Sequence, residues 1–140
     1  MADEHRLEAE VLTPEGEVFR GDLFQLSTRT SVGEVGIRAR HAPLVARLVP
    51  NELRLWTSEN ESDVVRYAQG EGWLEVFANR VRVLVAEVKT PDELDVSELK
   101  QRLEDAEQAL KEAEDGSAAA EQAERERARC EAFIQIAESG

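Results

Sequence analysis

The chain has 140 residues, a formal net charge of −13 and few aromatic residues, at 5%. Proteins that bind nucleic acid or an anionic lipid surface need clustered Lys and Arg, so this charge argues against both classes of partner. No apolar run approaches the ~20 residues that span a bilayer, and the first residues lack the apolar stretch of a signal peptide. The one cysteine, Cys130, has no partner for an internal disulfide and fits a reducing compartment.

Residues 1–90 carry the alternating pattern of strands that bury one side. Apolar residues occupy every second position in several short runs, for example at Leu7, Ala9 and Val11. Clusters of Pro, Gly and Asn separate these runs at short spacing, and residues 63–88 indicate three consecutive strands. The pattern predicts an all-β domain, an antiparallel sandwich or barrel.

From Pro91 onward the period becomes helical. In the first predicted helix, apolar residues recur three and four apart: Val96, Leu99, Leu103, Ala106, Leu110 and Ala113. Asp95 is the expected N-cap, Glu98 completes a capping box, and Gly116 ends the helix. A second helix follows over residues 118–138 with a thin stripe: Ala120, Ala123, Arg127, Cys130, Ile134 and Ala137. We expect an antiparallel hairpin that buries little apolar area, and the stripe permits packing against the sandwich or standing away from it.

Residue types that carry chemistry are sparse. Neither His5 nor His41 has a metal-ligand spacing with Cys or another His, and the glycine pairs lack the Lys of a phosphate-binding loop. An enzyme built on His41 and Glu34 would need a pocket that few residues are left to form. We therefore expect no catalytic residue, no metal and no cofactor in this chain.

The most distinctive stretch lies in residues 30–44. It reads Gly33-Glu34-Val35-Gly36-Ile37 followed by His41-Ala42-Pro43-Leu44. Two further stretches agree in order and spacing, Thr13-Pro14-Glu15-Gly16 and Gly72-Trp73-Leu74-Glu75-Val76. Over essentially its whole length the chain resembles the epsilon subunits of F-type ATP synthases. The resemblance implies a flattened ten-stranded β-sandwich over residues 1–90, followed by an antiparallel two-helix hairpin over residues 91–140.

The resemblance also implies partners. The sandwich would bind the gamma subunit and the c-ring subunits of the central stalk, with Thr13 and His41 near gamma and Glu34 facing the c ring. The hairpin would extend towards the catalytic alpha and beta subunits and inhibit ATP hydrolysis. The chain itself would be non-catalytic. Its complex would translocate protons, with sodium as the alternative ion, and would hold the chain as a peripheral protein on the cytoplasmic side of the plasma membrane.

The loop between Ile37 and His41 departs from the family pattern. Where the family carries an apolar or aromatic residue, then Pro, then Gly or Asn, this chain has Arg38, Ala39 and Arg40. Losing Pro and Gly should change the dihedral constraints of the loop. We expect the two arginines to pair with acidic groups on the ring or on gamma.

A second departure concerns nucleotide binding. Some family members hold ATP on the folded hairpin through two arginines, whose places here are taken by Glu98 and Asp105. Carboxylates repel a triphosphate, so we expect no ATP binding of that type.

The second predicted helix carries three arginines, Arg125, Arg127 and Arg129. They are candidates for contacts with the catalytic subunits in an extended, inhibitory state. The alternative is local pairing, because Glu121 lies four residues before Arg125 and Glu131 four residues after Arg127. At the level of the whole chain, the alternative is a β-sandwich with a coiled-coil tail that serves as a binding module of an unrelated assembly.

Overall fold

The computed structural model describes residues 5–139. Within them, ten strands run β1 Leu7–Thr13, β2 Gly16–Leu23, β3 Gln25–Thr30, β4 Gly33–Arg38, β5 Leu44–Leu48, β6 Asn51–Trp56, β7 Val64–Gln69, β8 Gly72–Phe77, β9 Arg80–Val85 and β10 Val88–Lys89. A 3-10 turn, η1 Pro91–Glu93, leads into α1 Val96–Glu112 and α2 Ala118–Glu138. The expected ten-stranded sandwich with two following helices is confirmed. Residues 1–4, on which the signal-peptide expectation partly rests, lie outside the described residues.

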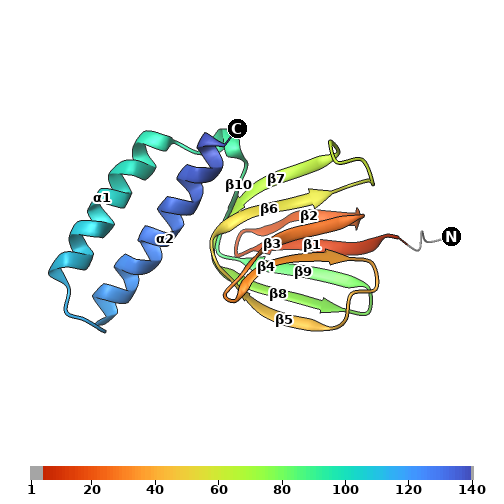
Figure 1. Ribbon diagram of the computed structural model, residues 1–140, viewed down its shortest axis with the longest axis horizontal. Helices are drawn as coiled ribbons and strands as arrows, with labels where there is room; N and C mark the ends of the chain where they lie inside the picture. Colours follow the sequence, from red (N-terminus) through yellow and green to blue (C-terminus); the bar gives the residue numbers. More distant parts are fainter. Residues whose placement is uncertain (1–4, 140) are drawn as a thin grey trace.

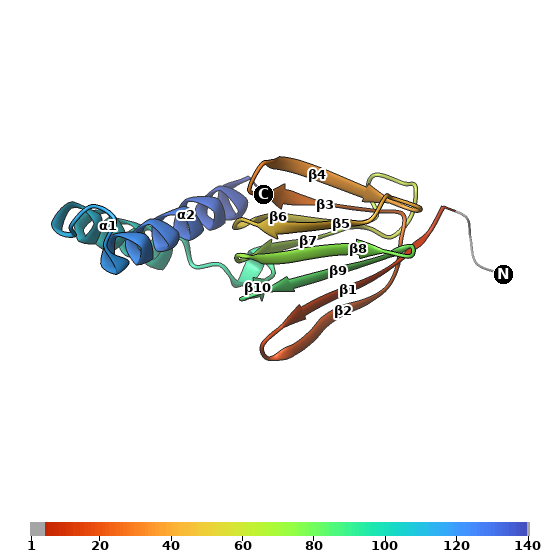
Figure 2. The same cartoon turned by 90° about the horizontal axis from the view of Figure 1, so that it is seen from below.

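The strands form two layers on one hydrogen-bonded path. The path runs β10-β7-β6-β3-β5-β8-β9-β1-β2, and β4 pairs with β3 alone. It passes from one layer to the other between β3 and β5, which pair only through Thr30 and Leu48. The three strands expected within residues 63–88 exist, but β7 belongs to one layer and the β8–β9 hairpin to the other. The strands run up and down along a roughly common axis, so the turns lie at the two ends of the sandwich (Figures 1 and 2).

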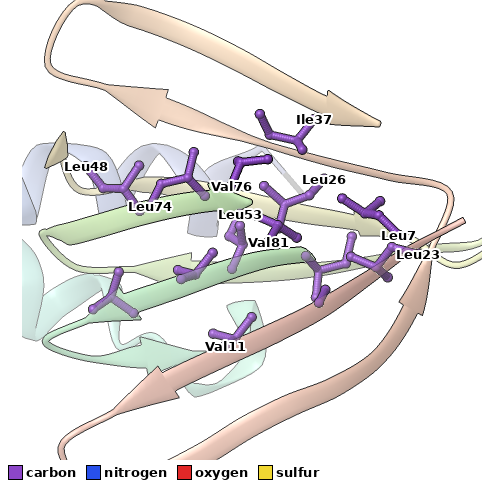
Figure 3. Close-up of a cluster of buried hydrophobic side chains, with 14 residues drawn as sticks. Leu7, Val11, Leu23, Leu26, Ile37, Leu48, Leu53, Leu74, Val76 and Val81 are labelled. Atoms are coloured by element: carbon purple, nitrogen blue, oxygen red, sulfur yellow. The ribbon is translucent and has the colours of Figure 1, made fainter. Parts of the chain in front are cut away.

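The core between the layers is almost entirely aliphatic. Figure 3 shows leucine, valine and isoleucine side chains from both layers meeting there. The buried members are Leu7, Ala9, Val11, Leu23, Leu26, Ile37, Leu48, Leu53, Leu55, Leu74, Val76, Val81, Val83 and Val85. The alternating positions of the sequence therefore account for this core, because successive strand residues face opposite sides.

One buried polar group connects β7 with β3 and with the β5–β6 connection. Gln69 is fully buried; its Oε1 accepts a hydrogen bond from the Thr28 hydroxyl. Its Nε2 donates to the carbonyls of Val49, at 3.1 Å, and Gly70, at 2.7 Å. A buried amide is stable only when its donors and acceptors are used, and here both are.

The helix boundaries follow local signals. The Asp95 carboxylate accepts a hydrogen bond from the Glu98 backbone N–H at 3.1 Å, which confirms the predicted N-cap. The Glu98 carboxylate, expected to complete a capping box, instead lies 3.9 Å from the Arg102 guanidinium. Ser117 caps α2 by accepting from the Ala120 N–H at 3.1 Å, and Gly116 precedes it with φ 75°.

The hairpin packs against the sandwich, which the sequence left open. It lies beyond one end of the strands, with α2 the nearer helix (Figure 1). Phe133 and Ile136 of α2 are buried together with Ala68 of β7, Leu99 of α1 and Cys130. The predicted stripe omitted Phe133 and Ile136 because it described one contact face, whereas α2 has two, one for α1 and one for the sandwich.

Candidate functional site

The outer face of the β5-β8-β9-β1 layer exposes apolar side chains. Val45, Trp73 and Phe77 are 70%, 51% and 71% exposed. Trp73 and Phe77 alternate along β8, and Val45 of β5 pairs with Glu75 between them, so all three share one face. We call these three residues the apolar face. Contiguous exposed apolar side chains rimmed by polar residues mark interaction sites in soluble proteins.

A ladder of ion pairs borders the apolar face across β9, β1 and β2. Glu10 lies 3.0 Å from Arg20 and 3.5 Å from Arg82, and Arg82 is also 3.9 Å from Glu75. Arg20, Arg82 and Glu75 are about half exposed and Glu10 is 16% exposed, so solvent weakens each of these pairs. A charged rim beside exposed apolar side chains is the arrangement that orients partners at protein interfaces in general.

The predicted contact residues Thr13 and His41 lie at opposite ends of this layer. Thr13 ends β1 at the helical end, where its Oγ1 accepts from the Glu15 N–H at 3.2 Å. His41 precedes β5 at the far end, and its Nδ1 lies 2.7 Å from the Ala42 carbonyl oxygen. That nitrogen must carry a proton, because a carbonyl only accepts. The two residues bracket the apolar face and do not meet.

The loop after β4 holds Arg38 and Arg40. Arg38 stacks over the Phe24 ring at 4.9 Å and donates through Nε to Gln25 Oε1 at 2.9 Å. Arg40 has φ 65°, a left-handed conformation that costs a non-glycine residue roughly 1–2 kcal/mol. Replacing Gly or Asn by Arg at this place therefore adds strain to a left-handed position.

Asn79 holds that loop, and the sequence reasoning missed it. Its Oδ1 accepts from the Arg40 N–H at 2.8 Å, and its Nδ2 donates to the Arg6 carbonyl at 2.8 Å. The Ala78-Asn79 turn signal placed a hairpin here but gave no sign of this bridging role. Asn79 thereby connects the β8–β9 turn, the start of β1 and the loop after β4.

Glu34 lies apart from these arginines. It is the second residue of β4, at the helical end of the sandwich, whereas Arg38 ends the same strand (Figure 2). Its side chain is 75% exposed and 3.6 Å from Arg29. Val32, at the tip of the same hairpin, is 95% exposed. The five predicted contact residues therefore form three places on the sandwich and not one site.

The three arginines of α2 have different partners. Arg129 holds Glu87 of the sandwich through Nε and Nη2, the latter at 2.9 Å, and stacks over Phe133 at 4.9 Å. Arg125 lies 4.0 Å from Glu71, also on the sandwich.

Local pairing holds for Arg127 and also for Arg129, which lies 3.3 Å from Glu126 of the same helix. Arg127 lies 3.7 Å from Glu131, as predicted, and also pairs with Glu124 at 2.5 Å. The predicted pairing of Arg125 with Glu121 is wrong, because Arg125 turns towards the sandwich and donates to Gln122 at 2.8 Å. Arg129 and, much more weakly, Arg125 thus connect the hairpin to the sandwich.

Cys130 lies beside the Arg129–Glu87 contact, and its thiol is sensitive to whether that region stays closed. The side chain is fully buried, and its Sγ lies 3.4 Å from the Glu126 carboxylate. Burial, with the hydrogen bond to Glu126, raises the pKa of the Cys130 thiol to about 11. The reactive species is the thiolate, so this cysteine is inert while the hairpin is docked.

An open polar groove of about 760 Å³ separates α2 from the outer side of β3, β4 and β6. Its walls mix both charges, with Arg29, Arg54, Glu52 and Glu131 among them. Among residues 5–139, no group of three or more His, Cys, Asp or Glu side chains is placed to hold a metal ion. In the same range, no helix is both long and apolar enough to cross a membrane.

Fold and surface together define a class: a ten-stranded β-sandwich that carries a helical hairpin at one end and an exposed apolar face on one layer. Residues 6–91 match the family described as ATP synthase, Delta/Epsilon chain, beta-sandwich domain. The ATP synthase epsilon chain of Sulfurihydrogenibium sp. is 36% identical over 91% of this chain and 94% of its own length. That of Persephonella marina is 38% identical over 91% and 93%.

Solved structures agree on the fold. A chain of the Euglena gracilis mitochondrial ATP synthase, in the OSCP/F1/c-ring assembly, superposes with TM-score 0.78 and 21% identity, covering 96% of this chain and 82% of its own. A chain of the Tetrahymena thermophila mitochondrial ATP synthase central stalk and c ring gives 0.63 and 18%, covering 97% and 99%. The chain therefore belongs to the ATP synthase epsilon chain family, to which the glycine–histidine–proline stretch pointed.

Proposed function

We propose that this chain is a non-catalytic subunit that docks on the gamma subunit through the apolar face. The observation that carries this is the exposure of Val45, Trp73 and Phe77 side by side on one layer. Large aromatic side chains at the centre of a charged rim are the usual anchors of protein interfaces. Thr13 and His41, which the resemblance places near gamma, lie at the two ends of this layer. The domain division at residue 90 then separates the gamma-binding part from the tail.

Coupling to the c ring is assigned to the β3–β4 hairpin. Its tip carries the exposed Val32 and Glu34, and Glu34 makes a weak, solvent-exposed ion pair with Arg29. A protruding tip with one apolar and one acidic side chain fits a small contact with polar loops of a ring. Through these two contacts the chain links the stalk to a proton-translocating ring, on the cytoplasmic side of the plasma membrane. The complex alone then keeps it at the membrane.

The hairpin is the proposed inhibitory element. To reach the alpha and beta subunits it must leave the sandwich, which breaks the Arg129–Glu87 pair and exposes Phe133 and Ile136. The released Arg125 and Arg129 are then available to acidic groups of the catalytic subunits. Arg127, paired within α2, keeps its partners in either position because Glu124 and Glu131 move with it.

Binding to the gamma subunit of the same organism tests the apolar face. Replacing Trp73 and Phe77 together by Ser should weaken binding at least tenfold in calorimetric titration, because hot-spot aromatics each contribute about 2 kcal/mol or more. Val32→Ser, which alters an exposed apolar residue away from that face, is the matched control and should leave gamma binding unchanged. Equal affinity of the double variant and the native chain would overturn the docking proposal.

A truncation after Lys89 tests the tail in the reconstituted catalytic complex. We expect ATP hydrolysis to rise while gamma binding persists. Unchanged hydrolysis with intact binding would show that the hairpin is structural and not inhibitory.

A further inference from the structure

β4 is an edge strand whose outer side is open. It pairs with β3 along Gly33–Arg38, and no other strand of the described residues pairs with it. Figure 2 shows it at the margin of its layer. An edge strand with unpaired backbone groups is a template for another strand.

The direction of the open groups follows from β3. The Arg29 carbonyl accepts from the Val49 N–H at 3.2 Å, so Arg29 faces away from β4. Antiparallel pairs alternate between bonded and non-bonded residues, and Arg29 lies opposite Glu34. The outward backbone groups of β4 are therefore those of Glu34, Gly36 and Arg38. The Arg38 carbonyl already accepts from the His41 N–H at 3.2 Å and keeps a second lone pair.

The β4 edge carries the charges of Glu34 and Arg38 but lacks other features that protect edges. It holds no proline and no lysine, and Gly36 at its centre carries no side chain. Two other edges differ, because β2 pairs with β1 through a register shift and β10 has only two residues. Bulges and short length both discourage pairing.

We propose that two copies of this chain pair antiparallel through their β4 edges. With Gly36 opposite Gly36 of the second copy, Glu34 lies opposite Arg38 of the second copy, and the reverse pair forms by symmetry. In this register the residues whose backbone groups face outward, Glu34, Gly36 and Arg38, lie at the hydrogen-bonded positions of the new strand pair. Each of the three residue pairs then forms two backbone hydrogen bonds, six in all. The same register sets Val35 opposite Ile37 on the core side. Opposite charges directly across an antiparallel pair stabilise it, and like charges destabilise it.

Neighbouring registers lose this match. A shift of two residues in either direction about this centre leaves Glu34 or Arg38 opposite a glycine, and a shift of four sets Glu34 or Arg38 against itself. In one register, therefore, the β4 edge is complementary to itself in charge, in apolar side chains and in hydrogen-bonding positions. For this reason we favour a second copy of the chain as the partner strand.

The dimer is weak and belongs to the free subunit. A single strand pair buries less area than a stable interface needs, so we expect association between micromolar and millimolar concentration. The net charge of −13 on each copy opposes it, and ordinary salt screens that repulsion. If the proposed function holds, Glu34 takes part both in the dimer and in the c-ring contact. The dimer and the c-ring contact then exclude each other.

Sedimentation velocity of the full chain over that concentration range tests the proposal. The native chain should shift from monomer to dimer. Glu34→Arg and Arg38→Glu should each stay monomeric, since each sets like charges opposite one another. An equimolar mixture of the two variants should form dimers again, because each charge then meets its opposite. Both side chains are exposed, so folding, checked by circular dichroism, should be unaffected.

Crosslinking locates the contact independently. Gly36→Cys should form a disulfide-linked dimer under oxidation, because Cα atoms of a hydrogen-bonded antiparallel pair are about 5.5 Å apart, within disulfide range. Val45→Cys, an exposed position on the apolar face, should not. A native chain that stays monomeric throughout would overturn the proposal, as would dimers that persist in both single variants. Neither result bears on gamma binding, which the Trp73 and Phe77 variants measure separately.

Discussion

The contact between the hairpin and the sandwich depends on the Arg129–Glu87 pair. The two guanidinium–carboxylate hydrogen bonds are partly buried, with side-chain exposures of 18% and 27%. Hydrogen bonds to charged groups contribute about 1.5–3 kcal/mol when buried, whereas exposed ion pairs contribute less than about 1. A value of about 1–2 kcal/mol suits this intermediate exposure. Glu87→Gln should therefore raise the undocked fraction about 5- to 30-fold.

The rate at which the Cys130 thiol is labelled follows the opening of the cluster that buries it with Ala68 of β7 and Leu99 of α1, and undocking of the hairpin breaks that cluster. Labelling of Glu87→Gln should be about 5- to 30-fold faster than that of the native chain, after normalisation to the unfolded chains. Glu71→Gln is the matched control, since the Arg125–Glu71 pair at 4.0 Å is half exposed, and it should change the rate less than about twofold. Equal rates in the native chain and Glu87→Gln would refute the role of this pair.

Three further predictions concern other parts of the chain. Glu52 loses solvation, which raises its pKa, but hydrogen bonds from Arg66 and Arg54 prevail and hold it below its usual value. The stability that the ionised Glu52 contributes is present above its unfolded pKa and is lost as the pH falls through its folded pKa. Glu52→Gln should therefore lower the free energy of unfolding by about 1–2 kcal/mol at neutral pH and by little in acid, as measured by urea titration at several pH values. An equal loss in acid would contradict this. Gly72→Ala should destabilise by about 3 kcal/mol or more, because its Cβ would lie 1.9 Å from the Leu84 carbonyl oxygen, while Gly36→Ala, 3.6 Å from a Gln25 side-chain nitrogen, should cost under about 1; similar melting temperatures would show that β9 can yield. Titration of the chain with ATP should give no saturable heat, since Glu98 and Asp105 stand where arginines would be needed, and specific tight binding would refute that.

Local chemistry in the sequence determined much of this fold. Alternation at Leu7, Ala9 and Val11 predicted both a strand and its buried side, because period two is a property of the extended backbone itself. Asp95 began the first helix for an equally local reason, the need to satisfy free backbone N–H groups. The helix ends at Glu112, four residues before the predicted Gly116, which lies instead in the turn before α2 at positive φ. The resemblance in residues 30–44 supplied the family, which the comparisons confirm.

Only the tertiary structure decided which groups meet. The approach of Arg129 to Glu87, 42 residues away, depends on where the hairpin lies, and nothing in the helical period of α2 indicated that Phe133 and Ile136 face the sandwich. Asn79 likewise looked like an ordinary turn residue until the fold brought Arg40 and Arg6 to its side chain. Contacts between distant segments depend on the packing of whole layers, whereas periodicity and capping depend on a few neighbouring residues, and a sequence displays only the second kind directly.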